Sequence, residues 1–157
     1  MHQDIEKIIH KGDNIYYEKG FSVFNGHQNI FLGSNIYLVD TLINAGDGIG
    51  KVIIEDDVFF GHGVKVLARG HDFTKFGRDR QIGVIEKPIH IKRGAWIASG
   101  AIILGGVTLG EHSVVGAGSI VTKDIPTKGV VVGNPAKVVK YVDRELTLFE
   151  KVKRIFK

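Results

Sequence analysis

One histidine of this sequence lies where acid–base chemistry is expected. His71 stands in the segment ARGHDFTKFGRDRQIGVIEKP, which is polar, charged and without any repeat. Imidazole accepts a proton near neutral pH, and functional side chains favour loops held on rigid scaffolds. The chain has no cysteine, which excludes a disulfide framework, a thiolate metal site and a cysteine nucleophile. Covalent catalysis would therefore need another residue type.

The composition predicts a single domain made of strands and tight corners. A chain of 157 residues with 43% hydrophobic content supports one continuous core. Its 21 glycines, its 3 prolines and its many β-branched residues favour short strands with frequent corners. We therefore expect a single domain over residues 1–157.

Targeting and partner signals are few. The first residues lack the apolar stretch of a secretory signal, and no run approaches the roughly 18 apolar residues that span a bilayer. The net charge of +4 is modest, and no basic, aromatic-interleaved module appears. We expect a cytoplasmic protein with no membrane span and no nucleic-acid partner. The lysine-rich stretch 137–157 is suited to an anionic ligand.

Aliphatic residues recur at every sixth position in the second half of the chain. They are Ile91, Ile97, Ile103, Leu109, Val115 and Val121. Small or β-branched residues follow four positions after the first five of them, at Ala95, Ala101, Val107, Ser113 and Ser119. A helix repeats near 3.6 residues and a simple amphipathic strand repeats at two, so a period of six indicates short strands joined by corners.

This period predicts a three-sided coil in which each hexad forms one side. Residues 18 apart then stack, with Ile91 under Leu109 and Ile97 under Val115. We expect such coils over residues 30–125. The earlier positions of the pattern are Leu32, Leu38, Ile54, Phe60 and Val66, with Ile36, Leu42, Val58 and Val64 four residues after an aliphatic position.

Two interruptions and a terminal segment depart from the repeat. The segment NAGDGIGK at 44–51 breaks the phase, and a longer excursion loop runs from about 67 to 88. Apolar residues at spacings of three and four predict a short amphipathic helix over 142–157. Its apolar face is expected to pack on the prism end or on a neighbouring subunit.

The segment WIASGAIILGGVTLGEHSVVGAGSIVTKDIPTKGVVVGNPAK resembles the C-terminal half of the hexapeptide-repeat acetyltransferases. The similarity is strongest to galactoside and maltose acetyltransferases and to polysaccharide O-acetyltransferases, and it covers roughly residues 30–140. It implies an all-β, left-handed parallel β-helix, although ordinary parallel crossovers are right-handed. It also implies a homotrimer that binds acetyl-CoA in the groove between adjacent prisms. Because one scaffold hosts several functions, the function has to be inferred from individual site residues and not from the fold.

The resemblance implies direct acetyl transfer in a ternary complex. His71 matches the family's catalytic histidine and would deprotonate a hydroxyl of a sugar or polysaccharide precursor, which then attacks the acetyl carbonyl of acetyl-CoA. No metal is needed for this reaction.

Acceptor contacts are expected in DTLINAGD and beside the histidine. The candidates are Asn44, Asp40, Asp47 and Asp72. Asn44 ranks first, because an amide both donates to and accepts from a sugar hydroxyl.

The resemblance also assigns residues to the coenzyme. Ser99 lies near the thioester, while Gly100 and Ala117 must stay small beside the pantetheine arm. Thr122 and Lys123 approach the distal end of the coenzyme. The remaining candidates are Trp96, beside the groove or simply packed there, and Lys137 and Lys140, which meet phosphates as point charges or are plain surface lysines.

Three alternatives stay open. The first is N-acetylation of an amino sugar or drug by the same machinery, and the second is an inactive structural prism. The third is a zinc carbonic anhydrase of the same fold. Those enzymes resemble one another in a pair of histidines five apart on one coil, and the absence of such a pair here opposes this alternative. The other histidines are assigned to the terminal segment or to exposed faces and corners: His2, His10, His27, His62, His90 and His112.

Overall fold

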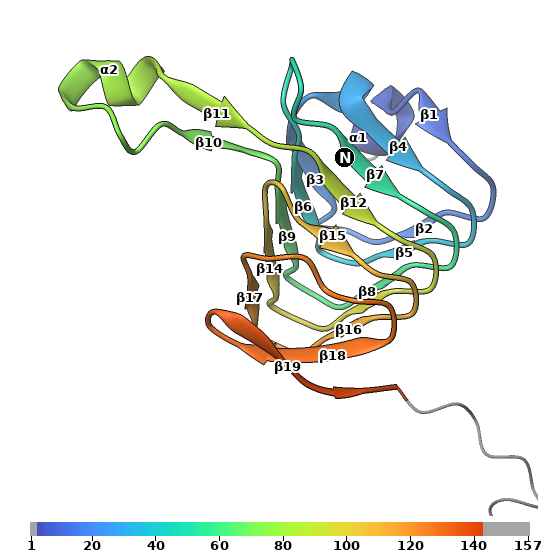
Figure 1. Cartoon of the computed structure of the whole chain (residues 1–157). Helices are drawn as coiled ribbons and strands as arrows, with labels where there is room; N and C mark the ends of the chain where they lie inside the picture. Colours follow the sequence, from blue (N-terminus) through green and yellow to red (C-terminus); the bar gives the residue numbers. More distant parts are fainter. Residues whose placement is uncertain (1–2, 143–157) are drawn as a thin grey trace, which may run out of the picture.

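The chain winds into stacked three-sided coils that form a triangular prism (Figure 1). The structure is a computed structural model and describes residues 3–142. The coils form three sheets, here named A, B and C, whose strands pair in parallel except for the last strand of sheet B, and a separate two-stranded hairpin stands beside them. This is the all-β, left-handed parallel β-helix predicted from the sequence.

Each sheet collects the same side of successive coils. Sheet A contains β1 (His10–Lys11), β4 (Ile30–Leu32), β7 (Val52–Ile54), β12 (Ile89–Ile91) and β15 (Thr108–Leu109). Sheet B contains β2 (Tyr16–Tyr17), β5 (Tyr37–Leu38), β8 (Phe59–Phe60), β13 (Trp96–Ile97), β16 (Val114–Val115), β18 (Gly129–Gly133) and β19 (Ala136–Tyr141). Sheet C contains β3 (Ser22–Asn25), β6 (Leu42–Asn44), β9 (Lys65–Leu67), β14 (Ile102–Leu104) and β17 (Ile120–Val121).

The predicted stacking of residues 18 apart is confirmed. Ile91 pairs with Leu109 between β12 and β15, and Ile97 pairs with Val115 between β13 and β16. The aliphatic and small positions of the repeat are buried, as the period requires. The coils therefore share one continuous core that no single repeat could form alone.

The coils begin earlier than residue 30. Strands β1, β2 and β3 form a first coil that pairs with β4, β5 and β6. Its interior is not filled by strand residues alone, because α1 (Gln3–Lys7) and the residues after it bring Ile5 and Ile8 into the core at this end. The hexad pattern is consequently weak here. A short 3₁₀ helix, η1 (His27–Asn29), leads into the next coil.

Leu42 does not take the inner position expected from the period. Thr41 and Ile43 are fully buried, whereas Leu42 is only half-buried. The preceding corner contains Asp40 with φ 44°, and the next residue of the hydrophobic core cluster after Leu38 is Ile43. The corner is thus one residue shorter than the repeat.

An excursion leaves the prism after β9 and returns before β12. It consists of β10 (Arg69–His71), α2 (Gly77–Ile82) and β11 (Val84–Glu86), with β10 antiparallel to β11. This hairpin projects away from the coils, and α2 forms its tip (Figure 1). It is called the excursion hairpin below.

The C-terminal side of the prism ends in an antiparallel pair, β18 and β19. The amphipathic helix predicted over 142–157 lies outside the described residues, except for Val142. Within residues 3–142, no helix is long and apolar enough to cross a membrane.

Two buried serines in the inner small positions are expected to respond oppositely to substitution by alanine. The Ser113 hydroxyl is buried without a hydrogen-bond partner, whereas the Ser119 hydroxyl accepts a bond from the Gly133 N–H at 3.1 Å. Ser113→Ala should raise the free energy of unfolding by about 1 kcal/mol, and Ser119→Ala should lower it by about as much. Denaturant titration of both variants checks this, and equal changes would contradict it.

Candidate active site

The excursion hairpin carries His71 at the end of β10. The ring is exposed and lies between two hollows. One hollow, of about 440 Å³, lies beside α2 and includes Arg80 and Gln81. The other, of about 170 Å³, lies at the base of the hairpin and is called the hairpin hollow; its lining is Phe24, Asn25, Asn44, Arg69, Gly70, His71 and Val84. The structure thus brings His71 and Asn44, two of the predicted site residues, to the same hollow.

The amide of Asn44 already has partners within the chain. Its Nδ2 donates to the carbonyl of Arg69 at 3.3 Å, and its Oδ1 accepts from Nδ2 of Asn25 at 3.4 Å. These bonds tie the end of β6 to the first residue of β10 and to β3. Asn44 therefore supports the base of the hairpin that holds His71.

Asp47 is occupied by a charged neighbour. Its Oδ2 accepts from Nη1 of Arg69 at 2.5 Å. The same guanidinium nitrogen lies 3.7 Å from Oε1 of Glu86. Asp47 does not line the hairpin hollow. Its carboxylate instead contacts Arg69 at the base of the hairpin.

The Glu86 carboxylate is held by the backbone of the 46–50 loop. It accepts hydrogen bonds from the N–H groups of Asp47, Gly48 and Gly50 at 3.0 to 3.1 Å. Burial pushes the pKa of the Glu86 carboxyl upward, but these bonds and the Arg69 charge outweigh it. The pKa of Glu86 consequently lies below its usual range.

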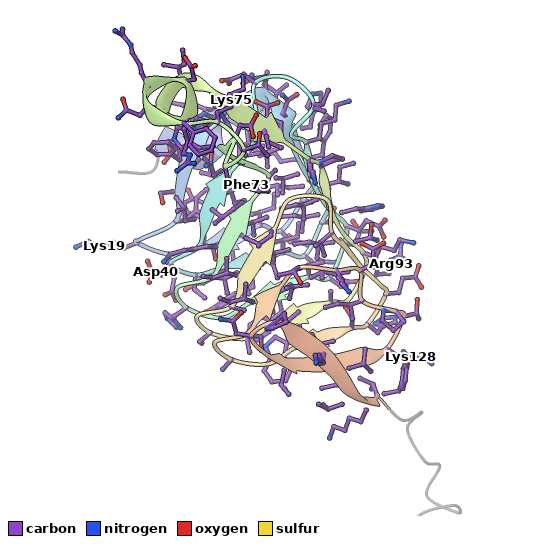
Figure 2. The ribbon with its side chains drawn as sticks, turned by 60° about the vertical axis from the view of Figure 1, so that its left-hand side comes forward. Lys19, Asp40, Phe73, Lys75, Arg93 and Lys128 are labelled. Atoms are coloured by element: carbon purple, nitrogen blue, oxygen red, sulfur yellow. The ribbon has the colours of Figure 1, made fainter. Side chains whose placement is uncertain are left out.

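The two remaining acceptor candidates lie elsewhere. Asp72 folds back on the hairpin, where hydrogen bonds from the Thr74 side chain and backbone lower the pKa of its carboxyl. Asp40 lies exposed at the corner between sheets B and C, where its carbonyl accepts from Gly63 N–H at 3.0 Å. Figure 2 shows Asp40 at one edge of the prism, below the excursion that carries Phe73 and Lys75.

A second site lies on the outer face of sheet B. This hollow of about 390 Å³ is called the sheet-B groove, and its lining is Tyr37, Val39, Phe59, Phe60, Gly61, His62, Trp96, Ala98, Ser99 and Ala117. Its wall is a ladder of rings from neighbouring strands. Ring centroids lie 4.6 Å apart for Tyr16 and Tyr37, 5.3 Å for Tyr37 and Phe59, and 6.3 Å for Phe59 and Trp96.

Glu18 fixes the tyrosine end of this ladder. The hydroxyls of Tyr16 and Tyr37 donate to its Oε1 at 3.1 and 3.3 Å, and His62 Nε2 lies 3.8 Å from its other oxygen. Burial raises the pKa of the Tyr37 phenol, and the Glu18 charge raises it further. The hydrogen bond to Glu18 likewise raises the pKa of Tyr16. Both phenols therefore stay protonated near neutral pH.

Three predicted coenzyme residues meet in the sheet-B groove, namely Trp96, Ser99 and Ala117. Gly100 follows Ser99 at the corner with φ 71°, a conformation that favours glycine. The other candidates do not line this groove. Thr122 and Lys123 are exposed after β17, and Lys137 and Lys140 are exposed on β19, an edge strand of the same sheet.

Within one chain, His71 and the sheet-B groove form separate sites. The two hollows that contain His71 share no lining residue with the groove. The groove borders the corner between sheets B and C, whereas the hairpin leaves between sheets C and A. In the part of the chain described here, no three His, Cys, Asp or Glu side chains are grouped so that they could hold a metal ion.

Several site residues were not found from the sequence. Tyr37 and Phe59 occupy the outward position just before an inner residue, the same position as Trp96, so a shared aromatic slot was the available signal. His62 was assigned to an exposed face, and it is exposed, but it also lines the groove. Glu86 had no signal in the repeat, because its partners are backbone groups of a distant loop.

Known proteins share both the sequence pattern and this fold. Residues 88–123 match the family model described as bacterial transferase hexapeptide (six repeats). A galactoside O-acetyltransferase of Lactococcus lactis is 31% identical over 145 residues, which cover 92% of this chain and 69% of that protein. A Schizosaccharomyces pombe relative is 35% identical over 131 residues, and the match covers 82% of this chain but only 58% of the relative's length.

A solved structure agrees with these matches. It is a hexapeptide-repeat acetyltransferase of Vibrio cholerae complexed with acetyl-coenzyme A, with a TM-score of 0.79 and 28% identity. The similarity covers 90% of this chain and 75% of that one. With the six-residue coils, the excursion hairpin and the groove already described, these matches establish that the chain belongs to the hexapeptide-repeat acetyltransferases.

Proposed function

We propose that this protein transfers the acetyl group of acetyl-CoA to a hydroxyl of a sugar or polysaccharide precursor. The observation that carries the proposal is the sheet-B groove, in which Ser99 and Ala117 lie beside an aromatic wall. Small side chains leave room for an extended pantetheine arm, and apolar rings can cover it. A relative of the same fold is complexed with acetyl-coenzyme A.

The proposed active site is formed by two chains of a homotrimer. His71 and the groove are separate within one chain, which supports a site completed by a neighbour. The excursion hairpin also exposes Phe73, Phe76 and Ile82 at 78%, 80% and 69%. Contiguous exposed apolar side chains mark interaction surfaces. A neighbouring prism is the proposed partner for this hairpin.

In the proposed reaction, His71 of one chain takes the proton of the acceptor hydroxyl as its oxygen attacks the acetyl carbonyl. Donors near Ser99 on the neighbouring chain stabilise the tetrahedral oxyanion. The carbon–sulfur bond then breaks, the acetyl ester is released, and coenzyme A leaves as the thiol after taking the proton from the imidazolium. Every step uses groups of the chain and of the two substrates.

The acceptor is proposed to meet the corner between sheets B and C. Asp40 is exposed there, one corner residue from the groove-lining strand, and its carboxylate has no assigned structural role of the kind found for Asp47 and Asp72. Sugar hydroxyls donate readily to carboxylates. Asp40 is therefore the acceptor contact that we favour among the four candidates. Lys137 and Lys140, on the edge of sheet B, remain proposed phosphate contacts.

The groove is tested by filling it. Ala117 is exposed on the groove wall, so Ala117→Trp should leave the core intact and raise the Kd for acetyl-CoA by about 10²-fold, because the indole occupies the arm's path. Isothermal titration calorimetry measures this. Thr127→Trp, at an exposed corner away from the groove, is the control and should leave Kd unchanged. Equal affinities for both variants would exclude the groove as the coenzyme site.

The activity is tested by thiol release from acetyl-CoA over a panel of neutral sugars and amino sugars. Release that depends on a neutral sugar supports O-acetylation, and release only with amino sugars moves the function to N-acetylation. Failure of the natural chain to bind acetyl-CoA at all would refute the enzyme proposal and favour the structural prism.

A further inference from the structure

We propose that Glu86 is a positioning residue that fixes the excursion hairpin so that His71 stands in the attack geometry. The inference rests on the proposed function, in which His71 is the general base. It concerns a carboxylate that lies outside both hollows of His71 and outside the sheet-B groove.

The Glu86 carboxylate sits in a cradle made by the 46–50 loop. Three backbone N–H groups of this loop donate to it, and its side chain is only 12% exposed. The glycines of the loop make the approach possible. A Cβ at Gly46 would collide with the Glu86 carboxyl group, and one at Gly48 would lie 3.0 Å from Oε2. Successive backbone N–H groups form a concave anion site of this kind.

The cradle joins two adjacent corners of the prism. The 46–50 loop connects β6 to β7, and the excursion hairpin connects β9 to β12, so both lie where sheet C turns into sheet A. Arg69 adds a second connection, because it contacts both Asp47 and Glu86. The hairpin is therefore tied to the preceding coil through its β11 strand as well as through the Asn44 bond to β10.

Register transmits this connection to His71. Arg69 faces Glu86 across the hairpin, and two residues farther on His71 faces Val84. Side chains two apart on a strand share a face, so His71 lies on the same face of the hairpin as the tied pair. If the hairpin rotated about its base, the imidazole of His71 would move with it.

A two-stranded hairpin is marginally stable by itself, so its direction must come from such connections. Misplacing a catalytic group by about 1 Å can cost about 10²-fold in rate. None of the residues that line the sheet-B groove lies on the hairpin, so a tilt of the hairpin leaves the wall of the groove unchanged. Loss of the Glu86 cradle is thus expected to lower kcat and to spare coenzyme affinity.

The test compares Glu86→Gln with the natural chain. The variant keeps the side-chain volume but replaces one carboxylate oxygen by an NH₂ group that cannot accept from the loop. We expect kcat to fall about tenfold or more, with the Kd for acetyl-CoA within about twofold. Glu111→Gln, at an exposed corner, is the matched control and should keep the natural kcat. Glu86→Asp keeps the charge but falls short of the loop, and it should lose kcat likewise.

A double substitution separates positioning from general damage. In the His71→Ala background, Glu86→Gln should cost less than about twofold, because a residue that acts through His71 has nothing left to position. The same fold-loss in both backgrounds, or an unchanged kcat in the natural background, overturns the inference. If His71→Ala itself leaves kcat unchanged, the proposed base is wrong, which is a separate result.

Amide hydrogen exchange tests the cradle without any turnover. The N–H groups of Asp47, Gly48 and Gly50 should exchange slowly in the natural chain and at least about tenfold faster in Glu86→Gln. Slow exchange in both proteins would show that the carboxylate does not hold the loop and would overturn the inference even for a folded, inactive variant.

Discussion

His71→Ala is expected to lower kcat by about 10²-fold or more while acetyl-CoA still binds. The imidazole is exposed on the excursion hairpin and is not part of the buried core, so its removal should leave the fold and its stability intact. The sheet-B groove is separate from His71 in each chain, and the coenzyme affinity should change little. Sugar-dependent thiol release measures kcat, and calorimetry measures Kd.

A histidine elsewhere on the prism supplies the control. His10 is exposed on sheet A, where its ring stacks on Phe31 with centroids 4.4 Å apart. His10→Ala should keep the natural kcat. A His71→Ala variant with full activity would exclude this side chain as the base, and one that loses acetyl-CoA binding would show that the hairpin contributes to the coenzyme site.

Two inactive variants are expected to restore activity when they assemble together. If His71 of one chain serves the groove of the next, a hybrid of His71→Ala and Ala117→Trp chains contains some sites with an intact histidine and an intact groove. Random assembly of equal amounts makes about one site in four of this kind, since each half-site has an even chance of being intact. The mixture should therefore show about a quarter of the natural rate.

The activity of the hybrid is compared with that of each variant assembled separately. Each variant alone should be almost inactive at an acetyl-CoA concentration that saturates the natural protein. A chain that carries both substitutions, mixed with the natural chain, controls for the assembly itself. Differently tagged subunits allow the hybrids to be isolated. Hybrids that contain both variants and show no activity would place His71 and its groove in the same chain.

The repeat could be predicted from the sequence because its physical cause is local. Ile91 and Ile97 stack on residues 18 positions later, and the narrow prism admits only small or β-branched residues such as Ala95 at the second inner position. The residue types within each hexad therefore show which of its positions are buried. Where a corner is shortened, as between Leu38 and Ile43, the period failed and Leu42 was placed wrongly.

The site was predictable only in part, because some of its residues follow the repeat and others depend on partners elsewhere in the chain. Trp96, Ser99 and Ala117 follow the repeat and do meet in one groove. Among the acidic and amide candidates, the residue type was visible but its partners were not. Asp47 is held by Arg69, Asp72 by Thr74, and Asn44 by its neighbours on β3 and β10.

By itself, the sequence determined the coil, its inward residues and the position of the excursion, because a strict period of six can be buried in few other ways. Only the tertiary structure decided which outward residues form a surface. Tyr16, Tyr37, Phe59 and Trp96 lie on four separate coils, and stacking brings their rings side by side. The cradle of Glu86 likewise depends on backbone N–H groups 36 to 39 residues away. Backbone groups carry no signature in the side-chain pattern, so such contacts emerge only once the chain has folded.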